Sequence, residues 1–438
     1  MRETNDASKY RILAQSERIA PVIWPGQDLL FRSLWKLNIP TVVQGLHHLT
    51  RGAWTPESFV RTHGAHPVTM LKSHGLPSER VSLARFFEEF GRNDEDRGHA
   101  VRLKDWPPSS SFEDEFRENY DAFMRAVPMQ AYTRYDGYRN LISHYGIPPY
   151  PIKSQKPDVG PKVYIATKDV LQEGSTRLHL DATCAVNLLS WTSSSDPDTT
   201  GAEWDIFAPE DLPALRGYLR AKCAKPDAQK GAMDPVHAQQ TYLTAEMLHE
   251  LRAINVRPYK IKQRLGDAVF IPAGAAHQVS NCQPCIKVAC DFLCIEGIAE
   301  SVKVAADFRK YDLTDVMQLE IVLWDAWDSL TFHSRDSEEN VTALSRAQKR
   351  KRRQRENERA EEDFKRRKLE RKANIGQKCP HLHCVNKPRR FPQLQGLFAH
   401  MYVLCVESRQ NSDCTLLQSG QARSPCARRR TSPLRWPL

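Results

Sequence analysis

Three residues of the sequence have the types and spacing of metal ligands. His179 and Asp181 are separated by one residue, and His277 follows much later in the segment Gly274-Ala275-Ala276-His277. Residues i and i+2 of a β-strand face the same side, so His179 and Asp181 could bind one ion together. Two histidines and one carboxylate occupy one face of an octahedral ion and leave the opposite positions open, as in non-haem Fe(II) oxygenases. The pattern predicts an Fe(II) site, although a His-x-Asp pair taken alone also arises by chance.

Short apolar segments with strand patterns surround these residues. Residues 266–274 predict a turn, a buried strand and a second turn, which would deliver His277. β-branched and other apolar residues predict further strands at residues 163–166, 185–189, 204–207 and 286–292. The ligands should therefore be presented by strands.

Helical periodicity occurs between and after these strands. Phe112, Phe116, Tyr120 and Phe123 recur at helical spacing and predict a helix over residues 109–126. Residues 38–43 predict the exit from a helix followed by a strand. Further helices are predicted at residues 211–221, 244–253 and 295–330.

Length, charge and cysteine content limit the class of protein. With 438 residues, the chain is long for one domain, so we expect a core of about 250–300 residues with extensions. The polar N-terminus lacks the apolar segment of a secretory signal, and no run of eighteen apolar residues predicts a membrane span. We therefore expect the eleven cysteines to be reduced thiols or metal ligands. Residues 346–372 hold fourteen Lys/Arg and six Asp/Glu, which is +8 of the net +10, so the remaining chain is near neutral.

Several longer motifs carry a family resemblance. They are LKDWP at 103–107, GPKVY at 160–164, TRLHLD at 176–181 with AVN at 185–187, DPVH at 234–237, GDAVFIPAGAAHQV at 266–279, IKVA at 286–289 and DF at 291–292. With them, the chain resembles the Jumonji C (JmjC) oxygenases, and among these the histone H3 lysine-9 demethylases, over residues 24–330.

The resemblance implies a mainly β fold with flanking helices. This would be a double-stranded β-helix, a cupin-like jelly-roll barrel braced by α-helices and followed by a basic tail that is largely helical or disordered. We expect a disordered lead-in at 1–23, the JmjC domain with its supports at 24–330, a charged linker at 331–372 and a Cys/His-containing tail at 373–438.

The resemblance also implies Fe(II) and 2-oxoglutarate as cofactors. Thr176, Asn187 and Lys287 would contact 2-oxoglutarate, Lys287 as the cation for its distal carboxylate, and Tyr164 would line a methyl-lysine channel. Each has an ordinary alternative. Thr176 could be a plain strand residue, Asn187 a buried amide, Lys287 a strand-edge lysine and Tyr164 a core aromatic residue.

By this resemblance the chain is a nuclear histone lysine demethylase that acts oxidatively on mono- or dimethyl-lysine 9 of the histone H3 tail. Two alternatives stay open: a JmjC hydroxylase of a non-histone side chain, and a catalytically silent chromatin-binding scaffold. Cys290, and Cys184 after Thr183, depart from the family pattern and bear on substrate preference more than on metal binding.

The C-terminal region contains two further candidate features. Cys379, Cys384, His400 and Cys405 approximate a zinc finger, against the alternative of a disordered tail. The cysteines at 282, 285, 290 and 294 also have knuckle-like spacing, but we expect buried thiols there because one of them lies within a strand. Basic clusters at 349–355 and 365–368 predict a bipartite signal for the nuclear import machinery, and they could contact DNA phosphates in chromatin.

Overall fold

The computed structural model describes residues 17–49, 54–73, 76–92, 98–108, 110–144, 157–169, 174–223, 233–315 and 317–336, with the pairs 377–378 and 390–391. The chain divides into two compact units, Met1–Phe364 and Lys365–Leu438. In the second unit, the described residues form one short antiparallel pair, β15 (Gln377–Lys378) and β16 (Arg390–Phe391).

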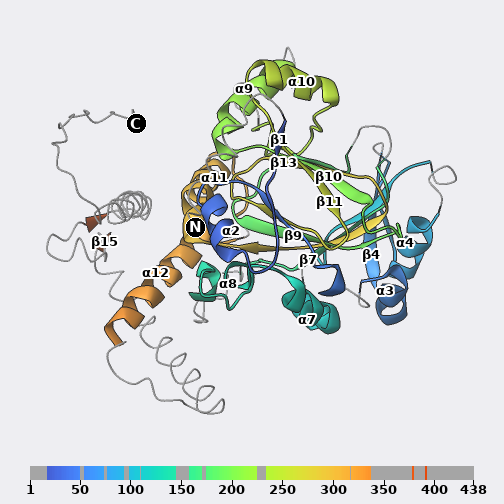
Figure 1. Ribbon diagram of the computed structural model, residues 1–438, viewed down its shortest axis with the longest axis horizontal. Helices are drawn as coiled ribbons and strands as arrows, with labels where there is room; N and C mark the ends of the chain where they lie inside the picture. Colours follow the sequence, from blue (N-terminus) through green and yellow to red (C-terminus); the bar gives the residue numbers. More distant parts are fainter. Residues whose placement is uncertain are drawn as a thin grey trace, which may run out of the picture. The chain divides into compact units, whose positions relative to one another are not determined.

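Two β-sheets form the centre of the first unit (Figure 1). The smaller sheet has the order β1 (Arg18–Ile19), β11 (Tyr259–Arg264), β10 (Thr200–Ile206), β13 (His277–Asn281) and β8 (Thr176–His179). The larger sheet has the order β2 (Val22–Ile23), β3 (Thr41–Val43), β12 (Ala268–Ile271), β9 (Cys184–Thr192), β14 (Cys285–Phe292), β7 (Lys162–Ala166), β6 (Val101–Trp106), β4 (Pro67–Lys72) and β5 (Glu79–Ser82).

The strand order confirms the predicted double-stranded β-helix. From β8 to β14 the chain crosses repeatedly between the two sheets, with β8, β10, β11 and β13 in one and β9, β12 and β14 in the other. Within this part, neighbouring strands pair antiparallel. Two antiparallel sheets joined by such crossings make a jelly roll, whose inner faces bury side chains between them.

Helices cover the outer face of the larger sheet. Helix α2 (Asp28–Trp35) buries Phe31 and Trp35 there, because its apolar residues recur at helical spacing. The Phe31 ring lies 4.8 Å from the ring of Phe270 on β12, and Trp35 stacks 5.8 Å from Phe292 on β14. With both faces covered, β9 and β12 have almost continuous burial.

The remaining helices follow or connect the strands of the two sheets. They are α3 (Pro56–His63), α4 (Leu83–Phe90), α6 (Phe112–Glu115), α7 (Arg117–Ala126), α8 (Gln130–Thr133), α9 (Leu212–Cys223), α10 (Ala245–Ala253), α11 (Ile298–Lys310) and α12 (Leu319–Asp336), with 3-10 turns at His47–Leu49, Leu141–His144, Pro209–Asp211 and Ile295–Gly297. A second apolar cluster joins Leu178 of β8 to Leu215 and Leu219 of α9, Leu251 of α10 and Val304 of α11. This cluster anchors the strand that carries His179.

Three predicted boundaries differ from the structure. Residues 18–23 were assigned to the disordered lead-in, but they form β1 and β2, since Ala20 and Ile23 are buried and the segment pairs with both sheets. The helix predicted over 109–126 is broken at Phe116, whose φ of −127° lets its ring pack 4.6 Å from Trp106. The helix predicted over 295–330 is two helices, and Asp312 and Gln318 in the connection have positive φ.

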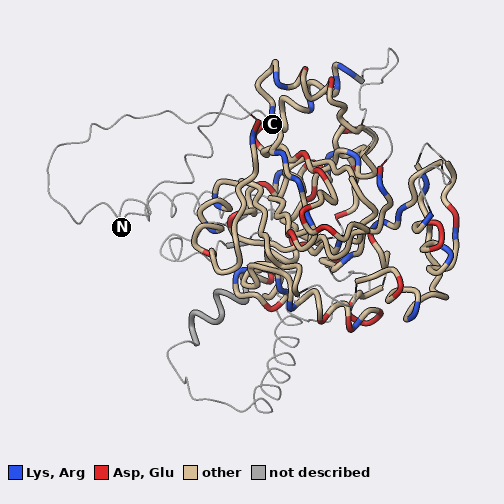
Figure 2. The backbone as a smooth tube through the Cα atoms, turned by 45° about the vertical axis from the view of Figure 1, so that its right-hand side comes forward, with Lys and Arg blue, Asp and Glu red and all other residues tan. Residues whose placement is uncertain are grey.

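The surface of the described region carries charges of both signs. Figure 2 shows Lys/Arg and Asp/Glu interspersed along the tube. No helix within the described ranges is long and apolar enough to cross a bilayer. The basic clusters at 349–355 and 365–368 lie outside the described residues, as does most of the tail.

Candidate metal centre

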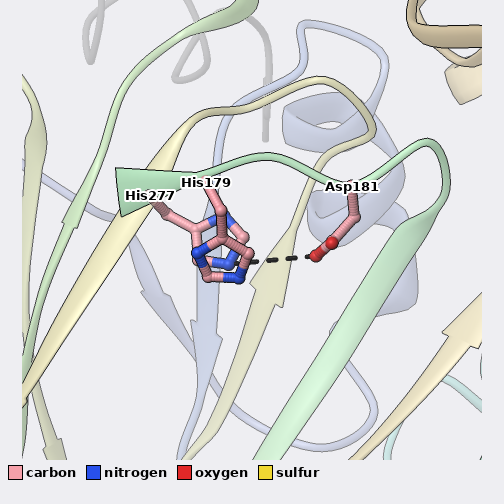
Figure 3. Close-up of side chains that lie close together, drawn as sticks. All are labelled: His179, Asp181 and His277. Atoms are coloured by element: carbon pink, nitrogen blue, oxygen red, sulfur yellow. Dashed lines mark ion pairs between the residues drawn. The ribbon is translucent and has the colours of Figure 1, made fainter. Parts of the chain in front are cut away.

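The structure brings His179, Asp181 and His277 together. One ligand atom from each residue lies within 4.8 Å of the other two, and the His277 Nε2 to Asp181 Oδ2 distance is 3.9 Å (Figure 3). The two imidazole rings are 4.2 Å apart between centroids. Across the described ranges, this is the one cluster of three or more His, Cys, Asp or Glu side chains with such spacing. The geometry fits the predicted 2-His-1-carboxylate site.

Paired strands and one turn position the three side chains. His179 is the last residue of β8, and it pairs in register with His277, the first residue of β13. β8 ends at His179, and Asp181 lies just beyond it. The prediction that both ligands lie on one strand was therefore wrong for Asp181. The Gly274 N–H donates to the Asp181 carbonyl oxygen at 3.0 Å. Gly274 has a φ of +71°, which favours glycine, so the turn before His277 also holds Asp181.

Backbone carbonyls orient both imidazoles for metal binding. His179 Nδ1 lies 2.8 Å from the Arg177 carbonyl oxygen, and His277 Nδ1 lies 3.0 Å from the Ala275 carbonyl oxygen. Because a carbonyl oxygen can only accept, each Nδ1 must carry the proton and donate it. Each Nε2 therefore keeps its lone pair for a metal, which is the usual arrangement behind a ligating histidine.

Burial also favours the neutral form of His277. Desolvation, and after it the neighbouring His179 ring, lower the pKa of His277 to about 4. A neutral imidazole is the form that binds a metal. The side chain of Asp181 is 42% exposed, whereas that of His277 is 5% exposed, so the cluster opens to solvent on the carboxylate side.

A buried cation lies deeper between the sheets. The Trp204 indole stacks on the His277 ring at 6.0 Å between centroids, and the Lys287 Nζ lies 5.9 Å from the same indole. Lys287 is 5% exposed and donates to Asn281 Oδ1 at 2.5 Å. Among the described residues, no carboxylate lies within ion-pair distance of Lys287. Its charge is therefore available to a carboxylate that enters the barrel.

The other two predicted cosubstrate residues have different surroundings. Thr176 lies on β8 opposite Val279, three residues before His179. Asn187 lies on β9, in the opposite sheet from β8. Asn187 is buried, and its carbonyl oxygen accepts from Gln263 Nε2, while Gln263 Oε1 accepts from Trp204 Nε1. Gln263 therefore links the backbone of Asn187 to Trp204, whose indole stacks on His277.

Tyr164 lies in an acidic environment. Its hydroxyl donates to Asp105 Oδ1 at 2.5 Å, and burial, followed by Asp105, raises the pKa of Tyr164 well above its usual value. Burial raises the pKa of Asp291 in the same way, with further contributions from Asp181, Asp158 and Asp105. Tyr164 also pairs in register with Lys287. The Tyr164 hydroxyl therefore lies near several carboxyl groups, among them that of Asp181.

The described cysteines form no zinc site. Cys184, Cys282, Cys285, Cys290 and Cys294 are free thiols, and the first lies 3.8 Å from the last between sulfur atoms. All but Cys282, which is partly exposed, are buried, as expected for buried thiols. The candidate zinc ligands Cys379, Cys384, His400 and Cys405 lie outside the described residues.

Sequence reasoning missed Trp204, Gln263 and Asn281. Trp204 lies on β10 and Asn281 on β13. The alternation of side chains along a strand assigns each residue to one face of the sheet, but it does not tell which residue of another strand it contacts. Asp105 belongs to a motif that supported the resemblance, yet the motif assigned it no role. Contacts across the barrel supply those roles.

Comparison with known proteins agrees with this geometry. A family model described as "JmjC domain, hydroxylase" matches residues 194–292, which include His277 and Lys287. The chain is 31% identical to lysine-specific demethylase 3A of Gallus gallus over 348 residues, 68% of this chain and 26% of that protein. It is 29% identical to lysine-specific demethylase 3 of Drosophila melanogaster, over 74% of this chain and 43% of that protein. It is 31% identical to lysine-specific demethylase JMJ26 of Arabidopsis thaliana, over 65% of this chain and 40% of that protein.

The chain thus spans about a quarter to two fifths of the length of these relatives. The family match, at residues 194–292, includes β13, the strand that begins with His277. With the antiparallel jelly roll and the His-Asp-His cluster between its sheets, these matches show that the chain contains a JmjC domain.

Proposed function

We propose that this chain is an Fe(II)- and 2-oxoglutarate-dependent histone lysine demethylase that acts on mono- or dimethyl-lysine 9 of histone H3. The observation that carries the proposal is the convergence of His179, Asp181 and His277, with both Nε2 atoms free, beside the buried cation of Lys287. The relatives named above are called lysine-specific demethylases, which supports the same reaction.

The triad and Lys287 together suit the cosubstrate. Bound Fe(II) would supply the oxidising chemistry, with molecular oxygen as the oxidant: one oxygen atom would go into succinate as 2-oxoglutarate loses carbon dioxide, and the other would hydroxylate the N-methyl group, which then leaves as formaldehyde. His179, Asp181 and His277 would hold the ion on one face. Lys287 would pair with the distal carboxylate of 2-oxoglutarate, and the Trp204 indole would line the path between that cation and His277.

The charge around Tyr164 suits a methylated ammonium group. Asp105, Asp181 and Asp291 lie close enough to influence the pKa of the Tyr164 hydroxyl, so a cation is favoured where they meet. A mono- or dimethylammonium group retains an N–H that can donate a hydrogen bond to these oxygens, whereas a trimethylammonium group has no N–H. This difference supports the lower methylation states as substrates.

We also propose that the protein acts on chromatin in the nucleus. The two basic clusters between residues 349 and 368 support import and sequence-independent contact with DNA phosphates. A zinc ion held by Cys379, Cys384, His400 and Cys405 remains a proposal from spacing alone.

Product release from methylated H3 peptides tests the proposal. Wild-type protein with Fe(II), ascorbate and 2-oxoglutarate should release formaldehyde and succinate from mono- and dimethyl-lysine 9 peptides. His179→Ala should abolish both products, while His249→Ala, which changes an exposed histidine on α10, should not.

Three results would contradict the proposal in distinguishable ways. Succinate without formaldehyde would favour a hydroxylase of another side chain. Formaldehyde from peptides methylated elsewhere would move the target lysine. Neither product, from folded and iron-loaded protein, would leave the scaffold alternative.

A further inference from the structure

We propose that Gln278 positions the two strands that carry His179 and His277 relative to each other. It ties β13 to a connecting segment that is itself hydrogen-bonded to β8. This segment is residues 240–243, here called the clasp, which precedes α10. The inference rests on the proposed metal site and concerns residues that do not touch the metal.

The clasp covers the free edge of β8. This strand is the outermost of the smaller sheet, and its pairing with β13 is limited to two positions with an irregularity between them. On its other side, the Leu178 N–H donates to the Thr241 carbonyl oxygen at 2.8 Å, and Arg177 donates to the Gln240 carbonyl oxygen at 2.6 Å. The clasp therefore replaces a missing neighbouring strand immediately before His179.

The other end of the clasp is attached to β13 through Gln278. The Leu243 N–H donates to Gln278 Oε1 at 2.7 Å, and Gln278 Nε2 donates to the Leu243 carbonyl oxygen at 3.0 Å. The same Nε2 donates to Asp205 Oδ2 on β10 at 2.9 Å. Gln278 is 1% exposed, so its amide is fully satisfied without water.

Gln278 directly follows His277, and neighbouring residues of a strand point to opposite faces. His277 therefore faces the metal cluster while Gln278 faces the clasp. Because the clasp is bonded to Leu178 on one strand and Gln278 on the other, it fixes the spacing of His179 and His277. The Tyr242 side chain of the clasp also packs against Gly174, which precedes β8.

The consequence should appear in metal affinity. Groups behind metal ligands typically change affinity by about 10- to 100-fold when they are removed. Gln278→Met has similar volume but no amide, so it leaves both backbone groups of Leu243 and Asp205 Oδ2 without this partner. We expect the dissociation constant for Fe(II) to rise by about tenfold or more, with the apo protein still folded.

The test is anaerobic calorimetric titration of Fe(II) into full-length protein, with thermal melting of each apo variant. Gln283→Met is the matched control, because Gln283 lies beyond β13 and has no side-chain contact with the clasp. Arg177→Met is the second variant. Arg177 is exposed, so this variant should fold even if Gln278→Met does not, and it should weaken Fe(II) binding in the same direction by a smaller factor.

Hydrogen exchange provides a readout that general destabilisation would not reproduce. In Gln278→Met, the amides of Leu178 and Leu243 should exchange faster, while amides of β9 in the other sheet should not change. Unchanged Fe(II) affinity in both variants, or an equal loss in Gln283→Met, would overturn the proposal. Titration needs no turnover, so a wild-type chain that binds Fe(II) but releases no formaldehyde would refute the demethylase and leave the role of Gln278 intact.

Discussion

Replacement of Lys287 by methionine should separate cosubstrate binding from the rest of the reaction. Lys287 is buried, its Nζ donates to Asn281 Oδ1, and in the described region it has no carboxylate partner. A hydrogen bond to a charged group contributes about 1.5–3 kcal/mol. Loss of this contribution corresponds to a rise of roughly 10- to 150-fold in KM for 2-oxoglutarate. Methionine fills a similar volume, so we expect the free energy of unfolding to change by less than about 1.5 kcal/mol.

The assay is succinate release as a function of 2-oxoglutarate concentration, at saturating Fe(II) and fixed methylated peptide. Lys262→Met is the control, because Lys262 lies on β11 of the smaller sheet and is exposed, whereas Lys287 is buried on β14 of the larger sheet. KM for the peptide should stay within about twofold of wild type, since uniform loss of cosubstrate binding leaves other interactions in place. An unchanged KM for 2-oxoglutarate in folded Lys287→Met would refute the assignment of this cation.

Three further predictions follow from the same structure. Tyr164→Phe should raise KM for the methylated peptide by about 5- to 50-fold, and a rise in KM for 2-oxoglutarate instead would place Tyr164 in the cosubstrate pocket. Asp181→Ala should lower Fe(II) affinity by more than about 100-fold, because it removes a ligand and not only a supporting group; calorimetry that shows wild-type affinity would exclude the proposed ligand set. Burial raises the pKa of Asp267 to about 6, so the folded state binds this proton more tightly than the unfolded state, and stability should fall as pH rises from about 4 to about 6. Urea unfolding of Asp267→Asn should lack this loss, which is about 3 kcal/mol at most in the wild type, and a variant that loses the same stability over this pH range would contradict the prediction.

Residue types and their spacing were enough to predict the candidate metal ligands and the type of fold. His179, Asp181 and His277 could be chosen from residue type and spacing, because few side chains bind Fe(II) and leave it open. The buried strands β9, β12 and β14 were also predictable, since most of their residues are apolar, as is typical of strands covered on both faces.

Local pattern was less informative where tertiary contacts decide the backbone. Phe116 has helical spacing, but its ring is drawn into the aromatic cluster beside Trp106, and the helix breaks there. Residues 18–23 directly follow a polar segment, yet they form two strands because the distant strands β11 and β3 pair with them. Neither outcome depends on the segment alone.

The residues that support the candidate site are set by contacts that form when the domain folds. Trp204 meets His277 and Lys287 from another strand, Asn187 reaches the site through Gln263, and Leu243 meets Gln278 thirty-five positions away. Sequence periodicity assigns a side chain to a face, because the backbone repeat is local. It does not assign a partner across the barrel, because strand order and register set those distances, and these follow from packing of the whole domain.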